Sequence, residues 1–293
     1  MNDVKATILI PTTKGRGPVL PYSVGSVLNQ TVKEIEIFII GDGVDDSTRK
    51  VIHDLQKKDT RITFFDHPKG PRRGEIYRHD ALMNHAKGEI VCYLLDRDLY
   101  LSNHVETAFE YLINKNHSFY VGRGLNLDEQ GKVIFCRRMV SGKYDFKKLQ
   151  DESVRGFFLF SPVSHTLESY RNLPFGWRTT PSKYRTDIYM WEQFISYDKK
   201  IEMIASHDST ILYFKRGNHP GLSAHQRAKE LAAYFNCLSD QKKINDLTNK
   251  AFVNLIIEYE KLLVEPILIK GQSVSTVPIR ILKKFKEKLF KKW

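Results

Sequence analysis

The feature that most constrains this fold is a repeated alternation of apolar runs and amphipathic segments over the first hundred residues. The apolar runs at 6–10, 35–40, 61–65 and 89–95 predict strands, and residues 20–30, 46–57 and 75–86 show helical spacing. Strands separated by helices of this length are joined by right-handed crossovers in a parallel sheet. The sequence therefore predicts an α/β fold, with a mostly parallel central sheet flanked by helices.

After residue 100 the pattern becomes mixed. It predicts helices at 105–113, 187–197, 223–235 and 239–263, a hairpin of strands 118–121 and 132–135, a loop-rich aromatic stretch at 155–184, and short strands at 201–204 and 210–214. We expect one domain over residues 1–220, a helical appendage over 221–269, and a linker with a basic tail over 270–293.

The charge of +12 is concentrated at the end of the chain. Seven basic residues and one acid lie between Pro278 and Trp293. Apolar residues recur there at three- and four-residue spacing (Ile281, Leu282, Phe285, Leu289 and Trp293). This pattern predicts a basic amphipathic helix over 279–293 that lies on an anionic membrane surface, or alternatively packs on the body. A nucleic-acid-binding function would depend on charge alone, so we expect no specific nucleic-acid partner.

Cysteine usage and hydropathy indicate the compartment. Cys92, Cys136 and Cys237 show no paired spacing, which favours a reducing environment. No apolar run approaches the ~18 residues of a membrane span, and the N-terminus lacks a signal-peptide pattern. We expect a cytoplasmic protein whose tail could hold it at the inner face of the plasma membrane.

Asp96-Arg97-Asp98 follows the apolar run 90–95 directly. In sheets of this class ligands bind at the carboxyl ends of the strands. Two carboxylates there suit a hard divalent cation that keeps water and phosphate oxygens as further ligands. The alternative is a solvated turn at the end of a strand.

Four separate stretches together resemble a known family. They are Ile8-Leu9-Ile10-Pro11-Thr12, Ser26-Val27-Leu28-Asn29-Gln30-Thr31, Glu36 to Gly43 followed by Asp45-Asp46-Ser47-Thr48, and Ala81 to Asp98. In this order and spacing, the chain resembles the inverting family-two glycosyltransferases of the GT-A fold over about residues 5–215. The resemblance implies a nucleotide-sugar-binding half over 1–100 and an acceptor half over 101–220.

The resemblance also implies roles for residues in the donor half. Pro11 and Thr12 would contact the nucleoside, and Asp42 the base or ribose, although Gly41-Asp42-Gly43-Val44 departs from the family's Asp-Asp-Gly-Ser. The implied diphosphate contacts are Arg73 and Arg78. Asp96 and Asp98 would hold Mg²⁺ or Mn²⁺, and Asp96 would also contact the donor. We expect Asp98→Ala to remove metal-dependent donor binding and leave the fold intact.

In the acceptor half, Asp187 matches the family's general base at the start of a helix. Alternatively, Asp187 is simply an acid at a helix N-terminus, where the helix macrodipole favours negative charge. Trp177, Arg178 and Tyr184 precede it and could bind an acceptor sugar, although hydrophobic loop packing explains the segment equally well. His207 and His219 are secondary candidates for the metal or the diphosphate.

The implied function is transfer of a sugar from a nucleotide-sugar to an acceptor hydroxyl in cell-surface glycan or polysaccharide synthesis. The acceptor would be a glycan or a lipid-linked sugar. One alternative is a sugar-phosphate nucleotidyltransferase of related fold, indicated by the Gly-rich loop Lys14-Gly15-Arg16-Gly17. The other is a non-catalytic nucleic-acid-binding protein.

Overall fold

The computed structural model describes residues 3–128, 130–136, 160–196, 203–214 and 221–264, together with the short strands 268–269 and 272–273. The chain divides into two compact units, Met1–Phe252 and Val253–Trp293. The tail at 279–293 and His219 lie outside the described residues.

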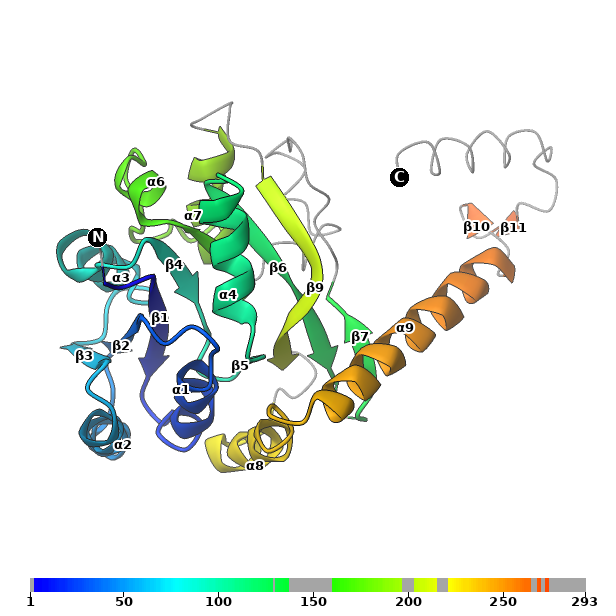
Figure 1. The fold of residues 1–293 in the computed structure, drawn as a ribbon, viewed down its shortest axis with the longest axis horizontal. Coiled ribbons are helices and arrows are strands. Elements are labelled where there is room, and N and C mark those ends of the chain that lie inside the picture. The colour runs from blue at the N-terminus through cyan, green and yellow to red at the C-terminus, as the bar shows by residue number, and fades with distance from the viewer. Residues whose placement is uncertain are drawn as a thin grey trace. The chain divides into compact units, whose positions relative to one another are not determined.

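The N-terminal half is the predicted parallel sheet. Its strands are β1 (Ala6–Thr13), β2 (Ile35–Asp42), β3 (Ile62–His67) and β4 (Ile90–Tyr93), which lie side by side in the order β3-β2-β1-β4 with parallel pairing (Figure 1). They alternate with α1 (Leu20–Leu28), α2 (Asp46–Lys58) and α3 (Glu75–Asp80), the last continuing into the π-helical turn η1 (Ala81–His85). The predicted helix at 75–86 is thus two segments.

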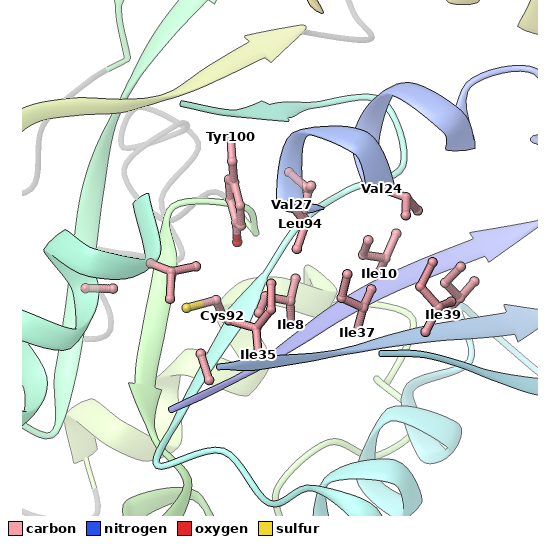
Figure 2. Packing of buried hydrophobic residues seen from close by; sticks show 14 of the residues in the cluster. Ile8, Ile10, Val24, Val27, Ile35, Ile37, Ile39, Cys92, Leu94 and Tyr100 are labelled. Carbon is pink, nitrogen blue, oxygen red and sulfur yellow. The ribbon is translucent and has the colours of Figure 1, made fainter. Parts of the chain in front are cut away.

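Successive side chains of a strand point to opposite faces of the sheet, and both faces of this sheet are buried. Ile8 and Ile10 pack with Val24 and Val27 of α1 in one cluster, which also holds the buried thiol of Cys92 (Figure 2). Leu9 belongs to the cluster on the other face. This two-sided burial is why the strands read as continuous apolar runs.

The C-terminal half of the sheet is mixed. It contains β5 (Leu99–Tyr100), β6 (Phe119–Leu127), β7 (Val133–Phe135), β8 (Val163–Thr166) and β9 (Met203–Phe214), and the order continues β4-β8-β6-β9-β5, with β7 on β6. Strand β8 is antiparallel to β4 and β6, whereas β6 and β9 are parallel. The helical segments of this half are α4 (His104–Phe109), η2 (Glu110–Asn114), α6 (Leu167–Arg171) and α7 (Thr186–Ser196).

Two expectations about this half are wrong in detail. Strand β8 lies inside the stretch predicted as loop, because its polar sequence Val163-Ser164-His165-Thr166 lacks apolar alternation although its first three residues are buried. The strands predicted at 201–204 and 210–214 are one strand, β9, whose pairing with β6 shifts register near Arg123. The polar residues 206–209, read as a break, lie within that strand. The predicted hairpin forms between residues 125–127 of β6 and 133–135 of β7, whereas residues 119–121, predicted as its first strand, pair with β8 and β9.

The remaining elements are α8 (Ala224–Phe235), α9 (Gln241–Val264), β10 (Leu268–Ile269) and β11 (Gln272–Ser273). Leu231 of α8 and Ile244 and Ala251 of α9 share a buried cluster with Leu125 and Leu212 of the sheet. The division between the two compact units falls within α9. Among the described residues, no helix has the length and hydropathy needed to cross a bilayer.

Candidate active site

Three parallel strands bring polar side chains to one edge of the sheet. Thr12 and Thr13 end β1, Asp42 ends β2, and Asp96 follows β4. The Thr12 hydroxyl donates to Asp96 Oδ2 at 3.1 Å, and the Thr13 hydroxyl donates to the backbone oxygen of Asp42 at 2.8 Å. The end of β1 therefore connects the two acids. Pro11 lies beside them in β1, partly buried.

The two acids after β4 differ in their surroundings. Asp96 Oδ2 also lies 3.7 Å from Nε of Arg16, and within the described residues its other oxygen has no hydrogen bond. Asp98 is fully buried and accepts from the Ser161 hydroxyl at 2.5 Å and the Phe214 N–H at 3.2 Å. Burial raises the pKa of the Asp98 carboxyl to about 6, although the charge of Arg97 opposes the shift.

These acids form a donor set that fits a hard divalent cation. Asp96 has a carboxylate oxygen with no hydrogen bond among the described residues, and a cation beside the two acids would offset the cost of their buried negative charge. No group of three or more His, Cys, Asp or Glu side chains with metal-site geometry occurs among the described residues. A bound ion would therefore take most of its ligands from water and from diphosphate oxygens.

The Asp42 carboxylate is enclosed by the loop before α3. Its Oδ2 is 2.5 Å from Nζ of Lys69, and its Oδ1 accepts from the Gly70 N–H at 2.6 Å. Position 74 requires glycine for the loop to approach Asp42. Its φ is +68°, and a Cβ there would lie 3.0 Å from Cβ of Asp42. Sequence reasoning missed Lys69, and the only available signal was the number of cations in this loop.

Arg78 is the buried cation of the site, while Arg73 is exposed. The Arg78 guanidinium donates to the backbone oxygen of Arg73 at 2.6 Å and lies 4.9 Å and 5.3 Å from the ring centroids of Trp177 and Phe160. Burial lowers its pKa, and the nearby negative charges oppose this, that of Asp187 most strongly. Its buried Nε has no hydrogen-bond partner in the described structure.

Asp187 lies in the first turn of α7, at the place predicted for a base. Burial raises the pKa of its carboxyl, and the positive charges of Arg78, Arg73, Arg185 and Arg97 oppose the increase. Asp187 of α7 and Arg78 of α3 therefore interact electrostatically. A carboxylate with a raised pKa next to fixed cations is typical of a functional site.

The three predicted acceptor residues separate into two environments. Trp177 is 2% exposed and donates through Nε1 to the Tyr93 hydroxyl at 3.2 Å, so it has the environment of the loop-packing alternative. Arg178 is exposed, and Tyr184 is partly exposed. His207 is exposed on β9.

The chain is similar to known proteins in sequence and in fold. Residues 7–164 match the family model described as Glycosyl transferase family 2. The chain is 29% identical over 172 residues to a GalNAc(5)-diNAcBac-PP-undecaprenol beta-1,3-glucosyltransferase of Campylobacter jejuni, covering 52% of this chain and 54% of that protein. It is 25% identical over 122 residues to the UDP-Glc:alpha-D-GlcNAc-diphosphoundecaprenol beta-1,3-glucosyltransferase WfgD of Escherichia coli, covering 42% and 46%. The chain thus spans about half the length of these two relatives.

Solved structures show the same fold at low sequence identity. Residues 1–349 of S. aureus TarS in complex with UDP-GlcNAc superpose with a TM-score of 0.58 at 13% identity, covering 81% of this chain and 68% of that one. A mannosyltransferase, PcManGT from Pyrobaculum calidifontis, in complex with GDP-Man and Mn²⁺, gives 0.51 at 15% identity, covering 97% and 80%. With more than half of its residues matched by the family model, this chain belongs to glycosyl transferase family 2 and has a fold similar to that of the GT-A glycosyltransferases.

Proposed function

We propose that this protein is an inverting, metal-dependent glycosyltransferase that moves a sugar from a nucleotide-sugar to a hydroxyl of a glycan or lipid-linked acceptor. The observation that carries the proposal is that Asp42 and Asp96 lie at the same edge of the sheet, with Asp98 two residues after Asp96, and that Asp187 interacts electrostatically with Arg78. Family membership favours transfer over the nucleotidyltransferase and nucleic-acid-binding alternatives.

The donor would lie along the ends of β1, β2 and β4. Pro11 and Thr12 would contact the nucleoside, and Asp42 would accept from the base or ribose. Because Lys69 and Gly70 already donate to Asp42, the loop 69–74 would be part of the donor site. Arg73 and Arg78 would bind the diphosphate, and the aromatic rings beneath Arg78 restrict the positions of its guanidinium.

Asp96 and Asp98 are the residues that would hold Mg²⁺ or Mn²⁺. Such an ion, when bound, supplies Lewis-acid stabilisation of the charge that develops on the leaving diphosphate. The Thr12 hydroxyl and Arg16 orient Asp96, while Ser161 and Phe214 orient Asp98. The Mn²⁺ in the structure of the mannosyltransferase supports this assignment.

Asp187 would take the proton from the acceptor hydroxyl. Inversion of configuration requires a base on the face of the sugar opposite the leaving group. Burial raises the pKa of Asp187 towards the range in which a carboxylate is an effective base, while Arg78 opposes the shift and favours the ionised form.

The proposal includes an acceptor that is anchored in a membrane and a tail that binds the membrane surface. Both curated relatives named above act on undecaprenol-diphosphate-linked sugars. An acceptor of that kind is anchored in a bilayer, and the net charge of +6 over residues 278–293 suits an anionic membrane surface. We therefore place the protein in the cytoplasm, peripherally on the inner face of the plasma membrane, in cell-surface polysaccharide synthesis.

The test is donor turnover by the purified chain with a panel of UDP- and GDP-sugars. We expect nucleoside diphosphate to be released with Mn²⁺ or Mg²⁺ present and not in EDTA. Full activity in EDTA would contradict the metal assignment. Pyrophosphate release from a nucleoside triphosphate and a sugar 1-phosphate would favour the nucleotidyltransferase instead.

A further inference from the structure

We propose that the acceptor carries a phosphoryl group next to its sugar, and that a cationic platform beside Asp187 binds this group. The cationic platform consists of Phe175, Arg178, Lys183, Tyr184, Arg185 and Tyr189. The inference rests on the proposed function, and it adds the residues that would bind the phosphoryl group of the acceptor.

Contacts between cations and aromatic rings order the platform. The Arg178 guanidinium lies 3.3 Å from the ring centroid of Phe175 and donates to the Tyr189 hydroxyl. The Tyr189 ring centroid lies 5.3 Å from that of Tyr184, over which Nζ of Lys183 lies at 5.1 Å. The side chains therefore support one another.

The positive charge of the platform is not neutralised. Residues 178–185 contain three cations and no acid. Within the part of the chain that the structure describes, no carboxylate lies within ion-pair distance of Arg178, Lys183 or Arg185. By contrast, Arg49 and Arg61 each pair with an aspartate at 2.8 Å. A guanidinium that stacks through its face keeps in-plane N–H donors for an anion.

The platform is adjacent to the proposed base. Arg185 precedes α7, and its positive charge lowers the pKa of Asp187. Tyr189 is two residues after Asp187 on the same helix. Arg78, which the proposed function gives to the donor diphosphate, also opposes the raised pKa of Asp187, so cations from both α3 and the segment before α7 act on the base. An anion held here would be close to the hydroxyl that Asp187 deprotonates.

Phosphoryl oxygens suit this arrangement. Arginine binds them through parallel N–H donors, and such charge-assisted hydrogen bonds are about twice as strong as neutral ones. The three cations exceed the single negative charge of Asp187, so the site would still attract an anion with the base ionised. The diphosphate of a lipid-linked sugar and the phosphodiester of a polymer both present this chemistry.

The experiment compares three acceptors that share one sugar: an alkyl diphosphate-linked form, an alkyl phosphodiester and an uncharged alkyl glycoside. We expect the KM of the best phosphorylated acceptor to be roughly tenfold below that of the glycoside and to rise with salt. The preferred phosphorylated form identifies the source of the anion. Equal KM values for all three acceptors would overturn the inference.

Variants assign the effect to the platform. Arg178→Gln and Arg178→Gln/Arg185→Gln should progressively remove the preference for the phosphorylated acceptor, and Arg178→Lys should restore part of it. Lys57→Gln is the matched control, because that lysine is an exposed cation on α2. A rise in KM that is equal for charged and uncharged acceptors would indicate a structural role and contradict the proposal.

Two readouts separate this inference from the proposed function. Absence of nucleoside diphosphate release with every nucleotide-sugar contradicts the function. Calorimetric titration of the alkyl diphosphate-linked and uncharged acceptors tests the platform independently of turnover. Salt-sensitive binding of only the charged acceptor, weakened by Arg178→Gln, supports the inference, and equal binding of both acceptors overturns it.

Discussion

At the scale of single residues, Arg78 connects the two halves of the site. It is 5% exposed, stacks with Trp177 and Phe160, and interacts electrostatically with Asp187, Glu75 and Asp42. A buried guanidinium is costly unless anions or hydrogen bonds compensate it. The acids of both halves provide that compensation. The proposed donor and acceptor functions therefore both depend on the charge of this arginine.

The first prediction concerns Asp187. Asp187→Asn preserves shape but cannot accept a proton, so turnover should fall by a factor on the order of 10²–10⁴ while donor binding is retained. In the unsubstituted protein, activity should fall as pH decreases through the raised pKa of Asp187, because only the ionised carboxylate is a base. Rate–pH profiles and donor titrations measure both effects.

Thermal unfolding is the control for the Asp187→Asn variant. A carboxyl whose folded-state pKa is raised contributes stability at low pH that is lost as pH rises through that pKa. Asp187→Asn should therefore unfold at the same or a higher temperature than the unsubstituted protein at pH 8. Near-normal turnover with the true acceptor, or retention of the donor's anomeric configuration, would exclude Asp187 as the base of an inverting reaction.

The second prediction revises the expectation that Asp98→Ala leaves the fold intact. Asp98 is fully buried, and its removal leaves Ser161 and the Phe214 N–H without their acceptor. Each unsatisfied buried group costs about 1–3 kcal/mol, so Asp98→Ala should unfold at lower denaturant concentration. Asp96→Asn should retain the fold and lose Mn²⁺-dependent donor binding. The reverse ranking of the two variants in urea unfolding would refute this distinction.

At the scale of elements, the start of β4 has little tolerance for a larger residue. A Cβ on Gly88 would lie 2.3 Å from the backbone nitrogen of Thr7 in β1, so one of the two segments would have to move. Since β1 and β4 pair through Thr7 and Val91, that movement would pass along the strands towards Thr12 and Asp96.

The third prediction follows from this contact. Gly88→Ala should reduce the free energy of unfolding by roughly 1–3 kcal/mol, the usual cost of overpacking, and should weaken nucleotide-sugar binding. Gly221→Ala is the control, because a Cβ there meets nothing within 4 Å. Urea unfolding and donor titration measure both effects. Equal stability of the two variants would show that the β1–β4 contact relaxes freely.

At the scale of the whole molecule, the fourth prediction concerns the basic tail. The full chain should sediment with anionic liposomes, and a chain ending at Val277 should not, because each lysine near an anionic surface contributes about 1 kcal/mol. Salt should release the full chain. Neutral liposomes are the control, and equal, salt-insensitive sedimentation of both chains would contradict membrane binding by the tail.

The sequence predicted the elements whose burial is strong and periodic. The four parallel strands are continuous apolar runs, so length and spacing were enough to identify them and the edge where Asp42 and Asp96 lie. Strand β8 was missed because its polar residues are buried against tertiary partners, and β9 was predicted as two strands because residues 206–209 in its middle are polar. The Tyr93 hydroxyl, for example, hydrogen-bonds to His165 Nε2 at 2.7 Å.

By itself, then, the sequence determined the α/β class, the order of the motifs and the strand-end positions of the acids, because these depend on local periodicity. Only the tertiary structure brought Lys69 to Asp42, placed Ser161 against Asp98, buried Trp177 beneath Arg78 and put Arg78 in the electrostatic environment of Asp187. These contacts join residues far apart in the chain, and their energies depend on burial and distance. Neither quantity exists before the chain folds.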